Sequence, residues 1–230
     1  TMLYGMAVFI ATIALPDMMG ALSSTQDQIT WSVTGNIVAT AIFTPFAGWI
    51  STRYEIRHIL LISVVGFILS SFFCGFSNNL EQIVTARFLQ GAFAAPLPPL
   101  AQTLILGAFP LYQRNLAIAI WGMANISGLV VAPMIGGFLG EILQGRWIFY
   151  CLMPFGFIAI ALVYFTVPLQ NDGQKNRFDW IGFISISICL GSLQIMFDRG
   201  ERNGWFESNE TIFQLGTALL AFYFFISHSL

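Results

Sequence analysis

Long apolar runs alternate with short polar connections along the whole chain. A helix needs roughly 20 mostly apolar residues to cross the hydrocarbon core of a bilayer. The pattern predicts eight such helices, over residues 3–22, 31–50, 59–76, 82–109, 116–139, 147–169, 180–197 and 212–230. A membrane β-barrel would instead show short segments of alternating polarity. We therefore expect an all-α membrane protein whose main partner is the lipid bilayer.

The composition narrows the function classes. Hydrophobic residues make up 57% of the 230 residues and charged residues only 9%, whereas a soluble domain has about 25% charged residues. A net charge of −2 provides no basic face for phosphates, so no nucleic-acid partner is expected. The three cysteines lie in apolar runs without CxxC spacing, and no GxSxG, HExxH or P-loop sequence occurs. We predict neither an enzyme nor a metal or cofactor site.

The distribution of Lys and Arg indicates the orientation, because cytoplasmic loops carry an excess of both. With a cytoplasmic N-terminus, five basic residues fall inside and three outside: Arg53, Arg57, Arg114, Lys175 and Arg177 against Arg146, Arg199 and Arg202. The first two outer loops contain neither Lys nor Arg. We expect a multi-pass protein of the inner (plasma) membrane with its N-terminus in the cytoplasm. The basic cluster that ends the seventh run is expected to form a solvated turn.

Weak internal repetition links the second and fifth runs. Pro45 precedes Gly48 by three residues in the second run, and Pro133 precedes Gly136 in the same way in the fifth. The third and sixth runs share the tripeptide Gly-Phe-Ile. An offset of three helices is typical of the three-plus-three inverted repeats in transporter halves, with chance matches as the alternative.

The loop after the second run resembles the loop signature of the major facilitator superfamily, Gly-x-Leu-Ala-Asp-Arg-x-Gly-Arg-Lys. Gly48, Arg53 and Arg57 match it, whereas Thr52 replaces the Asp and Glu55 the second Gly. The fourth run contains a sequence similar to the Arg-x-x-Gln-Gly motif of that superfamily, and the fifth resembles the antiporter motif Gly-Pro-x-x-Gly-Gly. The matching residues are Arg87, Gln90 and Gly91 in the fourth run, and Gly128, Ala132, Pro133, Gly136 and Gly137 in the fifth.

Further segments complete this resemblance along nearly the whole chain: 13–16, 28–31, 146–150, 178–182, 193–202 and 205–208. Together they are similar to the EmrB branch of the fourteen-span drug:proton antiporters. The resemblance implies a six-helix N-terminal half over residues 1–170, two linker helices over 171–230, and a second six-helix half missing from a fragment. It also implies a periplasmic adaptor and an outer-membrane channel as partners in a double-membrane bacterium. The chain departs from the family at Ala7 and Thr12, where members often carry Asp and Asn.

Arg87 is the basic residue that lies well inside a predicted span. A charge at that depth costs several kcal/mol unless it is paired or hydrated. We interpret it as a site facing the central cavity, for proton coupling or substrate, with snorkelling to the outer headgroups as the alternative. Gln90 shares its helix face and could bind Arg87 or substrate, and Gly91 is expected to permit close helix approach.

Other candidates have a structural alternative. Gly128, Ala132 and Gly136 recur every four residues and predict a smooth packing ridge, which Pro133 should kink; a proton-tight seal is the functional interpretation. Three prolines should break the fourth span midway: Pro96, Pro98 and Pro99.

Uncharged polar residues within spans are more often bonds between helices than substrate ligands. Three of them are candidates for a role in transport: Asn36, Gln102 and Asn125. In the loop after the second run, Arg53, Glu55 and Arg57 could form charge pairs that hold one conformation, or merely satisfy topology.

The sequence thus favours efflux of small amphipathic compounds in exchange for protons by alternating access. The alternatives are a same-fold exporter or importer of a specific metabolite or siderophore, and a membrane scaffold that transports nothing. Charged, glycine and proline features buried in the spans favour transport, since a scaffold needs none of them.

Overall fold

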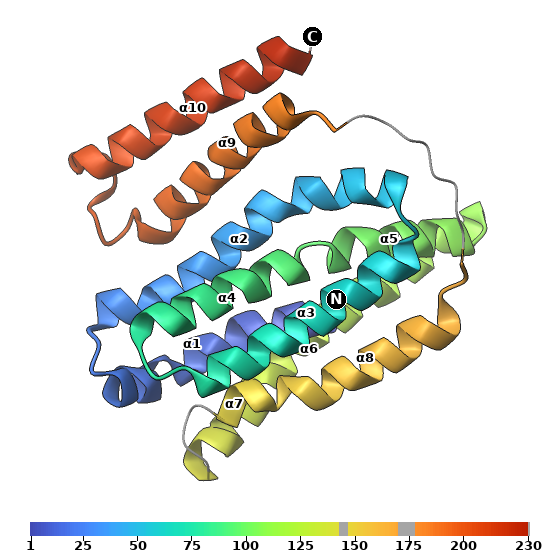
Figure 1. Cartoon of the computed structure of the whole chain (residues 1–230), viewed down its shortest axis with the longest axis horizontal. Coiled ribbons are helices and arrows are strands. Elements are labelled where there is room, and N and C mark those ends of the chain that lie inside the picture. The colour runs from blue at the N-terminus through green and yellow to red at the C-terminus, as the bar shows by residue number, and fades with distance from the viewer. Residues whose placement is uncertain (143–146, 170–177, 230) are drawn as a thin grey trace.

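A computed structural model describes residues 1–142, 147–169 and 178–229, which form helices joined by short connections (Figure 1). Within these ranges, eight segments are long and apolar enough to cross a membrane. The prediction of eight spans is therefore confirmed, and the protein is a multi-pass membrane protein. Three of the residues used to infer orientation, Arg146, Lys175 and Arg177, lie outside the described residues.

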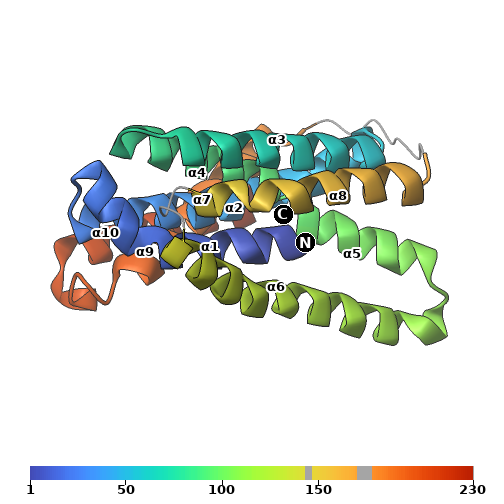
Figure 2. The ribbon, with the colours of Figure 1, turned by 90° about the horizontal axis from the view of Figure 1, so that it is seen from below.

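The first six spans form a bundle (Figures 1 and 2). Its helices are α1 (Met2–Leu22), α2 (Gln26–Arg53), α3 (Ile56–Phe76), α4 (Leu80–Ala94), α5 (Leu97–Ala108), α6 (Arg114–Ile142), α7 (Trp147–Tyr150) and α8 (Leu152–Thr166). A short 3₁₀ turn, η1 (Leu111–Gln113), precedes α6. The tightest pairs are α2 with α4, α1 with α6, and α3 with α4. Figure 2 shows α3 and α6 on opposite sides of the bundle, with α1 between them.

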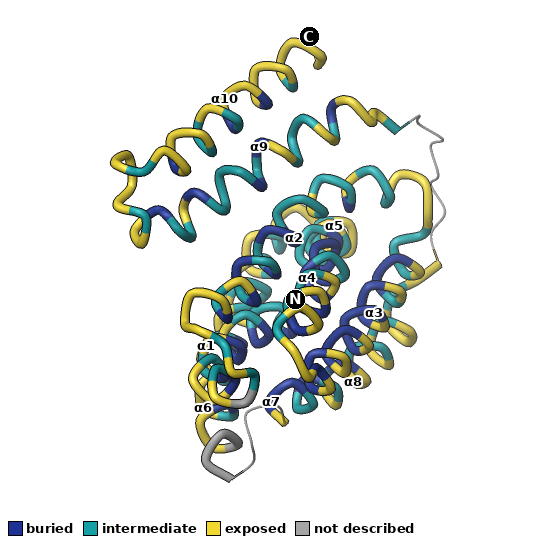
Figure 3. The backbone as a smooth tube through the Cα atoms, turned by 60° about the vertical axis from the view of Figure 1, so that its left-hand side comes forward, coloured by how far each residue is buried: buried dark blue, intermediate teal, exposed yellow. Residues whose placement is uncertain are grey.

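Apolar side chains both fill the bundle and cover its outside. The core contains Met6, Ile10, Phe67 and Phe149, each at most 1% exposed. Many large apolar side chains are instead turned outward, and Phe165 on α8 is 82% exposed. Lipid is the solvent for that outer surface, because water would not tolerate so large an apolar area. Figure 3 shows the contrast: buried positions gather between the bundle helices, and α10 is mostly exposed.

The fourth span is interrupted midway. The helix α4 ends at Ala94 and α5 begins at Leu97, with Pro96 between them. Proline has no N–H to continue the helical ladder, so the predicted break is confirmed. Ala95 and Pro96 are buried, as non-helical backbone at this depth must be.

The last two spans form an antiparallel hairpin beside the bundle. It consists of α9 (Trp180–Arg199), the 3₁₀ turn η2 (Trp205–Glu207) and α10 (Asn209–Ser229). The helix α9 packs on α2, and α10 packs on α9 (Figure 1). The expectation of a solvated turn at the end of α9 is wrong for Arg199, whose Nη2 lies 2.7 Å from Asp27 Oδ1 on α2.

Gly91 allows α2 and α4 to approach each other. A Cβ at this position would overlap the backbone carbonyl of Asn36, and a helix backbone cannot yield as a flexible side chain does. We predict that Gly91→Ala lowers the stability of the purified protein by about 1 to 3 kcal/mol, measured as a lower midpoint of thermal unfolding in detergent. Gly107→Ala is the matched control, since nothing lies within 4 Å of a Cβ there. Equal midpoints for the two variants would contradict the packing argument.

The Asp179 carboxylate begins α9. Its Oδ1 accepts the Gly182 N–H at 2.9 Å and lies 2.8 Å from His228 Nε2 at the end of α10. Two hydrogen bonds hold the pKa of Asp179 below its ordinary value: the larger effect is that of the Gly182 N–H, and the smaller is that of His228. A carboxylate with a lowered pKa stabilises the fold above its ordinary pKa, and this contribution is lost as the pH falls through the folded-state value.

We therefore predict that Asp179→Ala lowers the thermal unfolding midpoint at neutral pH, and that the difference from wild type shrinks in acid. The measurement is thermal unfolding in detergent between pH 7 and pH values near 3, the region in which a free Asp titrates. A difference that does not change with pH would show that the charge of Asp179 has no role.

Candidate functional site

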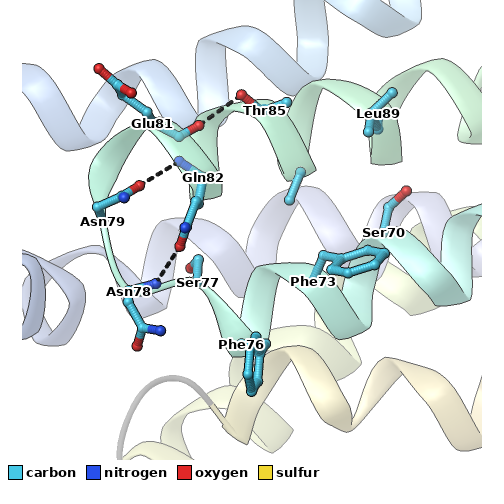
Figure 4. Close-up of a pocket in the computed structure, with 11 residues that line it drawn as sticks. Ser70, Phe73, Phe76, Ser77, Asn78, Asn79, Glu81, Gln82, Thr85 and Leu89 are labelled. Atoms are coloured by element: carbon cyan, nitrogen blue, oxygen red, sulfur yellow. Dashed lines mark hydrogen bonds between the residues drawn. The ribbon is translucent and has the colours of Figure 1, made fainter.

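The candidate site is centred on Arg87, on the second turn of α4. The helix begins at Leu80 because the Asn79 side chain caps it, with Oδ1 accepting the Gln82 N–H at 2.8 Å (Figure 4). Figure 4 also shows that this end of α4 faces α3 across a groove that Phe73 and Phe76 help to line. Arg87 lies on the other side of the helix and is 0% exposed.

Backbone carbonyls of two other helices receive the Arg87 guanidinium. Its Nη1 donates to the Ala7 carbonyl on α1 at 3.2 Å, and its Nε donates to the Ser32 carbonyl on α2 at 3.4 Å. The Phe149 ring on α7 lies 5.7 Å from the guanidinium carbon. In the described part of the chain, no Asp or Glu forms an ion pair with Arg87, and its buried Nη2 has no hydrogen-bond partner. A buried charge without a counterion is costly, so each carbonyl dipole matters.

These contacts correct both interpretations of Arg87. A side chain with no exposed surface does not line an open cavity in this structure, so the expected position facing the central cavity is wrong. The snorkelling alternative is wrong as well, since the guanidinium points into the bundle and not toward headgroups. Arg87 instead joins α1, α2 and α4 at one point.

Gln90 extends this arrangement to α3. Its Oε1 accepts from Arg87 Nη1 at 2.5 Å, and its Nε2 donates to Ser71 Oγ at 2.6 Å. Ser71 in turn donates to the Phe67 carbonyl of its own helix. The prediction that Gln90 binds Arg87 is confirmed, and the resulting chain of bonds crosses from α1 through α4 to α3.

Asn36 holds the same part of α4 from the side of α2. Its Nδ2 donates to the Arg87 carbonyl at 2.8 Å, and Thr40 Oγ1 lies 3.2 Å from the Gly91 carbonyl. The Asn36 side chain therefore forms a hydrogen bond between helices α2 and α4, as predicted. Gln102 lies on α5, and Asn125 on α6 donates to the Trp121 carbonyl of its own helix. Neither is among the residues that bind Arg87.

Sequence reasoning missed the groups that receive the guanidinium. The Ala7 and Ser32 carbonyls belong to the backbone, which has no signature in the sequence. Ala7 stood out in the sequence only as a departure from the pattern of the family that the chain resembles, on the turn of α1 that meets Arg87. The chain keeps a hydrogen-bond acceptor for Arg87 there but no charge.

The small-residue ridge on α6 packs against α1. A Cβ on Gly128 would lie 2.7 Å from the Met2 carbonyl oxygen, and one on Gly136 would lie 3.3 Å from Ile13 Cδ1. Ala132 between them is 0% exposed, so the predicted packing ridge is confirmed. Gly137 and Pro133 are exposed, and they do not contribute to that contact.

The loop between α2 and α3 contains one ion pair, which involves neither arginine of the loop. Glu55 Oε2 pairs with His58 Nδ1 at 2.9 Å. Arg53 lies over the Trp49 ring at 5.9 Å and Arg57 over the Tyr164 ring at 4.5 Å, both measured to the ring centroid. Among the described residues, no ion pair joins Glu55 to either arginine, so this conformation does not contain the charge pairs that were one of the two alternatives. Gly48 is exposed and has open space around it.

Comparison with known proteins gives relatives along almost the entire chain. It is 35% identical to the multidrug export protein EmrB of Escherichia coli K12 over 218 residues, which are 94% of this chain and 43% of that protein. It is 32% identical to the fatty acid resistance protein FarB of Neisseria gonorrhoeae, over 98% of this chain and 46% of that protein. The chain thus spans less than half the length of these relatives.

The fold has a counterpart among solved structures. A bacterial homolog of the human lysosomal transporter Spinster, in an inward-facing and unoccupied conformation, superposes with a TM-score of 0.61 over 96% of this chain and 57% of the other, at 17% identity. The family model described as Major Facilitator Superfamily matches residues 1–229. With its eight apolar spans, its bundle and this match, the chain belongs to the Major Facilitator Superfamily.

Proposed function

We propose that this chain is the N-terminal portion of a secondary active exporter that moves small amphipathic compounds out of the cell in exchange for protons. In this proposal residues 1–170 are one six-helix half and residues 171–230 are two linker helices. The substrate binds near the middle of the membrane between this half and a second one, and alternating access exposes it to either side.

The single observation that supports coupling is the arginine held by carbonyls. Its bonds to Ala7 and Ser32 exist only while α1 and α2 keep their positions beside α4. A guanidinium with an unpartnered Nη2 gains strongly from any acceptor that comes within reach. A movement of α1 against α4 therefore changes the energy of Arg87 by several kcal/mol, which makes it suited to sense a protonation event elsewhere in the transporter.

The relatives suggest the substrate class. One is called a multidrug export protein and another a fatty acid resistance protein. A fatty acid is amphipathic, and we infer for this chain too a substrate with a large apolar part. The protein would lie in the inner membrane with a cytoplasmic N-terminus, and a periplasmic adaptor and outer-membrane channel would complete the path in a double-membrane bacterium.

We predict that Arg87→Gln in the full-length protein abolishes export. Cells that express it should accumulate a fluorescent amphipathic dye to the level of cells without the transporter, because the charge that links α1, α2 and α4 is gone. A proton uncoupler should raise dye accumulation in cells with the wild type or the control variant, but not in cells with Arg87→Gln. Arg114→Gln is the control, since Arg114 is bound to the Phe109 carbonyl at the start of α6. Uncoupler-sensitive export by Arg87→Gln would refute the coupling role. Absence of export by the wild type as well as by Arg87→Gln would favour a scaffold.

A further inference from the structure

The helix α2 lies between the arginine network and the α9–α10 hairpin. On one face, the Ser32 carbonyl and the Asn36 side chain hold Arg87. On another face, Trp31 and Thr34 contact α9. The positions on the two faces follow one another within about one and a half helical turns of α2. A movement of α2 at one face therefore also moves the other face.

The contacts between α2 and the end of α9 form what we call the hairpin clasp, made by Asp27, Trp31 and Thr34 of α2 with Asp198 and Arg199 of α9. The Thr34 hydroxyl donates to the Asp198 carboxylate. Arg199 pairs with Asp27 at 2.7 Å, and its guanidinium carbon lies 4.4 Å from the centroid of the Trp31 ring.

The clasp is enclosed on the side of Thr34 and Arg199, whereas the Asp27 side chain is 60% exposed. Thr34 is 0% exposed and the Arg199 side chain is 11% exposed. Arg202 adds a bond from Nη1 to Thr30 Oγ1 at 3.1 Å. Exposed pairs contribute little because water screens them, but a neutral hydroxyl buried against a carboxylate loses its partner entirely when the bond is broken.

We propose that the hairpin clasp positions the part of α2 that binds Arg87, so that Thr34, Asp198, Asp27 and Arg199 are positioning residues for proton coupling. This inference rests on the proposed coupling role of Arg87. The bond to Asp198 fixes Thr34, two residues from the Ser32 carbonyl and two from Asn36. Loss of the clasp frees this turn of α2, which weakens the carbonyl contact that compensates the buried charge.

The titratable side chains beside Arg87 are Tyr4 of α1 and Cys74 of α3, and neither forms an ion pair with it. At the clasp the charges are those of Asp27, Asp198, Arg199 and Arg202.

The other end of the same helix pair provides a matched control. There, Phe178 and Phe183 from the α9 side pack on Phe46 and Trp49 of α2, with the Phe178 and Trp49 centroids 4.4 Å apart. This aromatic contact also fastens α9 to α2, but it lies more than two helical turns from Asn36. It contributes to the docking of the hairpin without touching the segment that binds Arg87.

The experiment measures drug–proton exchange against pH in proteoliposomes that contain the full-length protein, for Thr34→Val, Asp27→Asn and Phe183→Ala. Thr34→Val and Asp27→Asn are expected to shift the midpoint of the pH profile by about 0.5 to 1 pH unit. Phe183→Ala should lower the thermal unfolding midpoint in detergent but keep the wild-type pH profile.

The possible failures can be told apart. Equal shifts for Phe183→Ala and the clasp variants, or no shift for any of them, would overturn the positioning role while Arg87→Gln still abolishes proton-driven export. If Arg87→Gln itself keeps proton-driven export, the proposed function fails first and the positioning role fails with it. Thr34→Val replaces one hydroxyl by a methyl group. It therefore tests the positioning role even if Asp27→Asn folds poorly.

Discussion

A guanidinium enclosed by helices inside a membrane has few ways to offset the loss of its hydration. In this protein it does so with the backbone: Arg87 takes carbonyls from α1 and α2 and an amide oxygen from Gln90. The direction of each carbonyl is fixed by the helix that carries it. The positions of α1 and α2 therefore determine how well the charge of Arg87 is stabilised. The bundle and its buried arginine are therefore stabilised together.

The close approach of the helices depends on a glycine in each of two helix pairs. Gly91 on α4 meets the Asn36 carbonyl of α2, and Gly128 on α6 meets the Met2 carbonyl of α1. An inverted three-plus-three repeat relates the first span to the fourth and the second to the fifth. It therefore relates the α2–α4 contact to the α6–α1 contact. The two contacts join corresponding pairs of spans, although the glycine lies on the fourth span in one and on the fifth in the other.

Much of the fold could be predicted from the sequence, because hydrophobic length and proline chemistry act locally. The eight spans, the break at Pro96 and the ridge around Ala132 followed from such local rules. The site was only half predictable. Arg87 and Gln90 were found because charge and amide groups are rare in spans, but their acceptors on Ala7 and Ser32 are backbone atoms that any residue could supply. The partner of Arg199 was missed because Asp27 lies 172 positions earlier, and no spacing rule connects residues so far apart.

The interrupted fourth span has a chemical consequence of its own. Pro96, Pro98 and Pro99 each lack the N–H that would normally bond four residues back, so the carbonyl oxygens of Ala92, Ala94 and Ala95 lose their helical donors. This apolar stretch therefore contains backbone acceptors that have lost their usual donor, at a depth where lipid cannot supply another. Apolar side chains here accompany a backbone that is more polar than that of a regular helix, next to the turn that carries Gly91.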